Sequence, residues 1–159
     1  MFHYHVGLLS SDKTQHHEML KCKCDLLALQ VRIAAVDCPE TAKFGSSGQD
    51  FGDAATEFVQ SEIEGKRVRV KLLARDQYQR CVATVTYRRN LFWRVNLSEE
   101  LLKRGLATVY RQGGAEYDGS VERWDRIEEK AKSQKKGLWV AGSKRVDPAA
   151  YKRALKNQK

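Results

Sequence analysis

Residues 32–40, RIAAVDCPE, place an arginine and two carboxylates around one proline. Arg32 lies inside an apolar, β-rich run, Asp37 stands where that run ends, and Glu40 follows three residues later. A guanidinium fork binds two phosphate oxygens at once, while carboxylates bind divalent cations or activate water. These residue types therefore fit phosphate chemistry. The alternative is that Arg32 and a later arginine, Arg80, pair with the two carboxylates in a structural ion network.

The composition is that of a basic globular chain. With 159 residues it is long enough for one domain with a hydrophobic core. Lysine and arginine number 29 against 20 acidic residues, which gives a net charge of +9. Such a surface favours polyanions, namely nucleic acid, anionic lipid or an RNA-rich assembly, and the alternative is an ordinary basic protein.

The cysteines and histidines point only weakly to a metal. The four cysteines form no CxxC pair, Cys22 and Cys24 are spaced too closely for a usual zinc site, and reduced thiols are expected. An N-terminal metal site remains an alternative, although the alternation in FHYHVGLL more simply places histidines on the wet face of a strand. The histidines concerned are His3, His5, His16 and His17. The sequence shows no membrane-spanning stretch, signal peptide or Arg- and Ser-rich presequence.

The order of elements predicts an α+β fold, with strands first and helices later. About five strands with a helix inserted after the third fit an OB-type five-stranded bent antiparallel barrel with packed helices. The expected strands are residues 2–9, 26–36, 66–74, 80–88 and 91–97, the last two joined around Arg89 and Asn90. The expected helices are residues 50–64, one capped by Ser98 and ended by Gly105, one around 121–131, and one opened by Asp147 and Pro148. Trp93, Trp124 and Trp139 are expected to pack in the core or at its rim.

Four motifs in this order carry a family resemblance: RIAAVDCPE, DQYQR, GLATVY and KKGLW. Together they resemble the staphylococcal nuclease (thermonuclease) family over residues 24–140. The narrower match is with the fungal, mitochondrial, membrane-anchored probable endonucleases of that family. The resemblance predicts a nuclease-like domain at 24–140, an atypical strand and polar loop at 1–23, and a basic helical tail at 141–159. It also implies a mitochondrial location.

The resemblance implies a role for each charged residue of the opening stretch. Arg32 and Arg80 correspond to the two catalytic arginines of the family, and Glu40 corresponds to the carboxylate assigned as general base. Asp37 and the backbone carbonyl of Cys38 correspond to ligands of Ca²⁺, a cation that takes oxygen donors.

Substrate contacts and a further metal ligand are less complete in this sequence. Tyr78 and Tyr110 stand where the family contacts substrate phosphate. Active relatives add a calcium-binding aspartate from an early Asp-Gly-Asp segment, which the 159 residues do not contain. Counting back from Arg32 at the bacterial spacing reaches Glu18, a candidate replacement. We expect that the chain is truncated at its amino end or that a metal ligand, and with it the first barrel strand, has been lost.

Three functions follow from these observations. The first is a calcium-dependent phosphodiesterase, an endonuclease acting on the phosphate backbone of DNA or RNA. The second is a catalytically inactive nuclease-like module that serves as a structural subunit of a larger mitochondrial ribosomal or membrane complex. The third is a nucleic-acid or phospholipid binder without chemistry. The Arg32, Glu40 and Arg80 set favours the first function, and the missing acidic segment favours the second.

Overall fold

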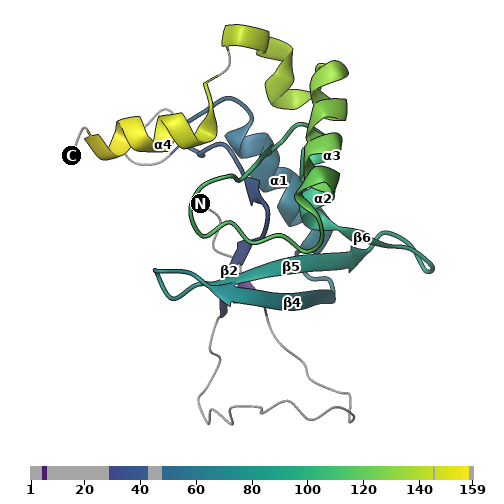
Figure 1. Ribbon diagram of the computed structural model, residues 1–159. Coiled ribbons are helices and arrows are strands. Elements are labelled where there is room, and N and C mark those ends of the chain that lie inside the picture. Colours follow the sequence, from purple (N-terminus) through teal and green to yellow (C-terminus); the bar gives the residue numbers. More distant parts are fainter. Residues whose placement is uncertain (1–4, 7–28, 43–47, 145, 158–159) are drawn as a thin grey trace.

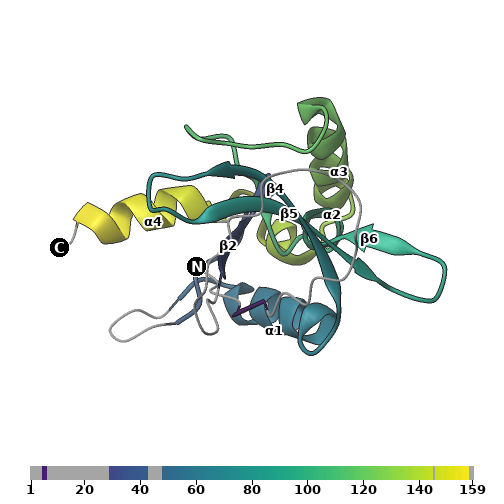
Figure 2. The same cartoon turned by 90° about the horizontal axis from the view of Figure 1, so that it is seen from below.

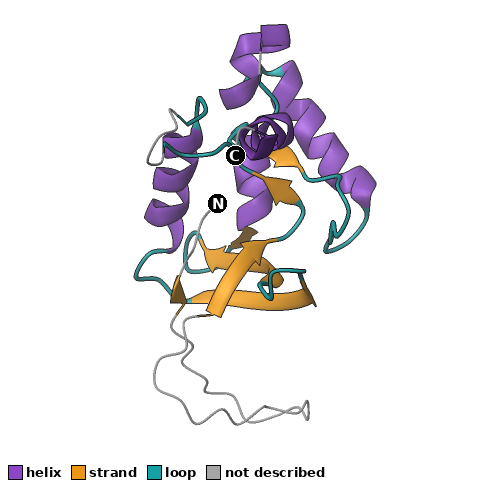
Figure 3. Cartoon of the chain, turned by 90° about the vertical axis from the view of Figure 1, so that its left-hand side faces the viewer, coloured by secondary structure: helices purple, strands orange, loops and turns teal. Residues whose placement is uncertain are grey.

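The computed structural model describes residues 5–6, 29–42, 48–144 and 146–157, which form an α+β fold. Helices lie on one side of a strongly twisted sheet (Figures 1 and 3). The strands are β1 His5–Val6, β2 Leu29–Ile33, β3 Val36–Asp37, β4 Val68–Arg75, β5 Cys81–Arg88, β6 Arg94–Asn96 and β7 Thr108–Val109. The helices are α1 Gly52–Ile63, α2 Leu97–Lys103, α3 Val121–Ser133, the 3₁₀ segment Gly137–Lys144 and α4 Pro148–Asn157.

The main sheet has the order β1-β2-β5-β4, with β6 pairing the far end of β5. The α+β class is confirmed, but the sheet is open within the described residues and is not purely antiparallel. β2 pairs β5 in parallel, with Arg32 opposite Val82, whereas β4 and β6 pair β5 in antiparallel fashion. The parallel pair is possible because β3, α1 and β4 supply the long crossover that parallel strands require.

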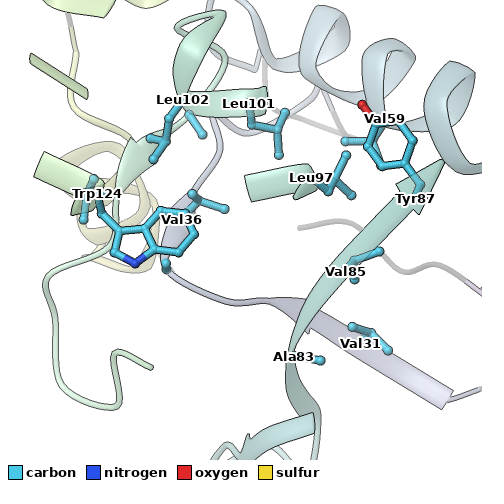
Figure 4. Packing of buried hydrophobic residues seen from close by; sticks show 13 residues of the cluster. Val31, Val36, Val59, Ala83, Val85, Tyr87, Leu97, Leu101, Leu102 and Trp124 are labelled. Atoms are coloured by element: carbon cyan, nitrogen blue, oxygen red, sulfur yellow. The ribbon is translucent and has the colours of Figure 1, made fainter. Parts of the chain in front are cut away.

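The hydrophobic core fills the space between this sheet and the helices. Val31 and Ala83 face it from the sheet, Leu97 and Leu101 from α2, and Trp124 from α3 (Figure 4). Trp124 is only 2% exposed, as expected for a core tryptophan. The core therefore joins α2 and α3 to β5, an interior strand of the sheet.

The expected helices form, but the cap of α2 differs from the prediction. Asn96, and not Ser98, is the N-cap residue, and its side chain accepts hydrogen bonds from the backbone N–H groups of Ser98 and Glu99. Ser98 is buried, and its hydroxyl donates to the carbonyl of Ala34 at 2.8 Å. Both residue types favour N-caps, so the tertiary contact of Ser98 decided between them.

The hairpin after β5 also differs from the prediction. Residues 91–93 were expected to begin a strand, but β6 begins only at Arg94. The Asn90 side chain accepts hydrogen bonds from the backbone N–H groups of Phe92 and Trp93, at 3.1 and 2.8 Å, and so extends the turn. Trp93 is 69% exposed, so the expectation that it packs in the core or rim was wrong.

The two ends of the chain are described to different extents. α4 begins at Pro148 as predicted, and the Tyr151 N–H donates to the carbonyl of Asp147 at 2.9 Å. The candidate ligand Glu18 and the histidines other than His5 lie outside the described residues. In the described part of the chain, no helix is both long and apolar enough to cross a bilayer. The predicted domain boundaries stay predictions.

Candidate active site

The centre of the candidate site is a pair of carboxylates joined by one ammonium group. Asp37 ends β3 and Glu40 follows Pro39, and both side chains are largely buried, at 12% and 15% exposed. The Lys152 Nζ, from α4, donates a hydrogen bond to Asp37 Oδ1 and lies 3.4 Å from Glu40 Oε1. The structure thus brings the two predicted carboxylates together around one positive charge.

The backbone around Glu40 is held from several directions. The Glu40 N–H donates to the Gln49 side chain at 3.1 Å, and the Gln49 N–H donates to the Glu40 carbonyl at 2.8 Å. The Gln49 amide group also donates to the carbonyl of Val146, just before α4, at 3.3 Å. Gly52 begins α1 so close to Glu40 that a Cβ at Gly52 would stand 2.4 Å from the Glu40 carbonyl oxygen. Gln49 therefore links the Glu40 loop to α4, and Gly52 permits α1 to pack against that loop.

Arg32 lies beside Tyr110, the second predicted substrate-contact residue. The Arg32 guanidinium carbon is 4.1 Å from the centroid of the Tyr110 ring, a cation–π distance. The Tyr110 N–H donates to the Ala35 carbonyl at 2.9 Å, and β7, which ends one residue earlier, pairs with β3. Thr108 is the partner of Asp37 in that pairing, and Tyr110 and Asp37 line the same shallow cavity.

Arg80 stands at the start of β5 and is paired with an acid from its own turn. Its Nε and Nη2 lie 2.6 and 2.5 Å from Asp76 Oδ2, and both side chains are 9% exposed. Asp76 Oδ1 accepts hydrogen bonds from the N–H groups of Tyr78 and Arg80. The Arg80 guanidinium also lies 5.1 Å from the centroid of Tyr78, whose side chain is 59% exposed. The Asp-x-Tyr-x-Arg motif is thus a closed local unit.

The strand register relates these two groups of residues. Val82 pairs with Arg32, and Arg80 precedes Val82 by two residues, so both arginines project to the same face of the sheet. Strand spacings put their Cα atoms about 8 Å apart. The shallow cavity nearest the site is lined by Asp37 and Tyr110 together with residues of α3 and α4. Arg32, Glu40 and Arg80 do not line that cavity, so the predicted convergence in one cleft stays a prediction.

The electrostatics of the site favour a charged Glu40 carboxylate and a neutral Cys38 thiol. Burial opposes ionisation of Glu40, but nearby positive charge, including that of Lys152, holds its pKa below the usual range. Burial, with the Asp37 charge beside it, raises the pKa of the Cys38 thiol to about 12. A thiol that stays protonated is a poor metal ligand, so any Cys38 contact with a metal would have to come from its carbonyl, as the sequence analysis expected.

The donor set suits calcium in kind but is small. Asp37 and Glu40 supply oxygen donors, which Ca²⁺ prefers, but that cation usually takes six to eight of them. No group of three or more His, Cys, Asp and Glu side chains with metal-site geometry occurs among the described residues. These residues therefore form at most part of a calcium site.

Two positioning residues were missed in the sequence analysis. Asp76 belongs to the motif that was identified, and its i, i+4 spacing to Arg80 across a turn was the available signal. Lys152 had no such signal, because it lies 115 residues from Asp37 within a basic tail.

The sequence is similar to that of known nucleases. Residues 30–141 match the family described as staphylococcal nuclease homologues. Endonuclease Htp3 of Saprolegnia parasitica is 44% identical over 134 residues, which cover 83% of this chain and 62% of that protein. The proteins named probable endonuclease LCL3 of Schizophyllum commune and Pyricularia oryzae are 43% and 47% identical, over 79% and 78% of this chain.

The chain spans only 45% and 48% of the length of those two LCL3 proteins. The matched region nevertheless contains Arg32, the carboxylate pair and the whole turn that holds Arg80. Because the family match covers more than half of the sequence, this chain belongs to the staphylococcal nuclease family.

Proposed function

We propose that this protein is a calcium-dependent phosphodiesterase that cleaves the backbone of DNA or RNA. The observation that supports it most is the pair of largely buried carboxylates, Asp37 and Glu40, on the segment that follows the strand carrying Arg32, whose guanidinium stacks on Tyr110. Nuclease chemistry needs a base for the attacking water, oxygen ligands for a cation and donors for the phosphate oxygens. Glu40, Asp37 and Arg32 are groups of these three kinds.

In this proposal Glu40 accepts a proton from the attacking water. The water oxygen bonds to phosphorus, the bond to the leaving oxygen breaks, and that oxygen takes up a proton. The lowered pKa of Glu40 keeps it ionised at neutral pH, as a base must be. Its hydrogen bonds with Gln49 fix the backbone that carries it.

Arg32 and Arg80 bind the phosphate oxygens, where negative charge accumulates during the attack. A preorganised donor of this kind contributes about 3–4 kcal/mol to lowering the barrier. Tyr110 restrains the Arg32 guanidinium and Asp76 restrains that of Arg80, so neither needs to be ordered when substrate binds.

Calcium, when bound, would supply positive charge to the phosphate and the water. Asp37 and the Cys38 carbonyl would hold it. The α4 helix would have to release Asp37 first, because Lys152 occupies that carboxylate.

The test is hydrolysis of short single-stranded DNA and RNA at low salt, with calcium varied from zero. We expect calcium-dependent cleavage that Glu40→Gln lowers by roughly 10²–10⁴-fold, while phosphate-driven binding of the strand persists and weakens as salt rises. Glu57→Gln, an exposed residue of α1, is the matched control. The absence of cleavage at any calcium concentration would refute the proposal.

The second candidate is an inactive nuclease-like module in a larger assembly. The ion pairs of Lys152 with Asp37 and Glu40 favour it, because carboxylates that are paired with a lysine of the same chain resemble a structural ion network. This candidate predicts salt-sensitive binding of a polyanion without cleavage. A mitochondrial location is proposed for either candidate, and imaging of the tagged full-length protein tests it.

A further inference from the structure

The hairpin between β5 and β6 ends in three consecutive exposed apolar residues, which we call the apolar tip. Leu91, Phe92 and Trp93 are 72%, 85% and 69% exposed. Elsewhere in the described residues the large exposed hydrophobic side chains occur singly along the sequence. Scattered apolar residues are normal on a surface, but a contiguous run is costly unless it serves a contact.

The apolar tip is held in shape by hydrogen bonds. The Asn90 side chain accepts from the N–H groups of Phe92 and Trp93, and the Arg89 N–H donates to the Trp93 carbonyl at 3.0 Å. The Arg89 guanidinium forms an ion pair with Glu100 of α2, which attaches the base of the hairpin to the body of the protein. The hairpin therefore projects in this shape before it binds, and binding should cost little additional conformational entropy.

The base of the hairpin carries positive charge that the described residues do not neutralise. Arg88 and Arg94 are direct cross-strand partners, and both are exposed. Neither has an ion pair with an acidic side chain in the described parts of the chain. Like charges placed opposite each other destabilise a strand pair, so an anionic partner bound at this pair would relieve the repulsion.

We propose that the apolar tip inserts into the surface of an anionic lipid bilayer while Arg88 and Arg94 bind lipid headgroups. Tryptophan and phenylalanine favour the membrane interface, and basic side chains beside them add attraction to anionic lipid. A convex apolar projection suits a deformable lipid layer. It does not by itself form the basic groove in which strands of nucleic acid usually stack their bases.

The position of the hairpin is compatible with a site that remains accessible on the membrane. β5 separates Arg80 from Arg88 by eight residues, about 27 Å along a strand. The hairpin and α4, which carries Lys152, lie at opposite sides of the molecule in two perpendicular views (Figures 1 and 2). Insertion of the apolar tip would therefore leave the candidate active site facing away from the bilayer. This proposal does not depend on the hydrolytic one.

The test is flotation of the full chain with vesicles of phosphatidylcholine alone or with about one-third phosphatidylserine. We expect binding to the anionic vesicles only. Replacing Leu91, Phe92 and Trp93 by serine should weaken it at least tenfold, and Arg88→Gln with Arg94→Gln should weaken it about tenfold or more. The matched control is Leu72→Ser with Val140→Ser, two exposed apolar residues outside the hairpin, which should bind normally.

A second measurement separates a lipid contact from a nucleic-acid contact. Tryptophan fluorescence should shift to the blue on adding anionic vesicles, and Trp93→Phe should remove the shift while vesicle binding persists. The proposal is overturned if vesicle binding is equal for the serine variant and the wild type. It is also overturned if the serine substitutions weaken binding of single-stranded DNA and leave vesicle binding unchanged, which would assign the apolar tip to base stacking.

Discussion

Removing the Lys152 ammonium should strengthen calcium binding at the candidate site. Lys152 Nζ lies 3.4 Å from Glu40 Oε1 and also pairs with Asp37, so an incoming cation competes with it for both carboxylates. At an effective dielectric constant of about 20, one such pair at this distance has a Coulomb energy of about 5 kcal/mol. Desolvation and the ordering of the lysine side chain offset a large part of that energy.

If about 2 kcal/mol remains, Lys152→Gln should lower the calcium concentration for half-maximal binding roughly 30-fold. Calorimetric titration with calcium chloride measures binding directly, and the calcium dependence of DNA cleavage gives the same midpoint if the proposed function is correct. Lys130→Gln, an exposed residue of α3, removes the same charge away from the site and should leave the midpoint unchanged.

Two results would refute this reasoning. An unchanged calcium midpoint in Lys152→Gln would mean that Lys152 does not compete with the cation. A midpoint that falls, together with a large loss of turnover at saturating calcium, would mean that Lys152 also contacts the substrate and is not merely a competitor.

Three further predictions concern stability and the arrangement of Arg80. Gly105→Ala should lower the free energy of unfolding by at least about 3 kcal/mol, against about 1 kcal/mol for Gly65→Ala. Both glycines have φ +68°, but only at Gly105 would a Cβ meet a backbone carbonyl, at 2.1 Å. Equal losses for the two variants in urea unfolding would contradict this. Burial opposes ionisation of Glu128, but its basic partners and a backbone N–H hold its pKa below the usual range. Its stabilising effect is therefore present at neutral pH and lost as pH falls below about 4.5. The free energy of unfolding of Glu128→Gln should thus depend less steeply on pH in acid, and an equally steep dependence in variant and wild type would exclude this role. Asp76→Asn keeps an acceptor for the turn but loses the ion pair with Arg80. We therefore expect kcat/KM to fall about tenfold and Tm to fall as well, because the Arg80 charge stays buried without its partner. An unchanged kcat/KM would show that the pair does not position Arg80.

Local chemistry in the sequence was sufficient for the helices and for the turn that holds Arg80. The helix expected at 50–64 occurs at 52–63, because its apolar spacing and the glycines near its ends are local signals. The turn that holds Arg80 was identified from the five residues DQYQR, all of whose internal contacts span four residues or fewer. Likewise α4 begins where Asp147 and Pro148 predicted.

The tertiary structure decided the features that depend on which distant segments meet. β2 pairs with β5 in parallel, whereas an antiparallel barrel was expected. The sequence of neither strand determines the direction in which the chain returns after the crossover. Ser98 lost its predicted cap role to Asn96 because its hydroxyl binds Ala34, 64 residues away. Trp93 is exposed because the Asn90 turn extends the hairpin beyond the sheet.

The candidate site shows the same division. The sequence by itself determined that Asp37 and Glu40 lie close together, since only two residues separate them and Pro39 bends the chain between them. Only the tertiary structure placed Lys152 on both carboxylates, across 115 residues. The physical reason is that a lysine in a basic tail has the same local pattern whether it is solvated or paired. Its partner is decided by where α4 packs, and that packing depends on contacts, such as that of Gln49 with Val146, which join segments far apart in the chain.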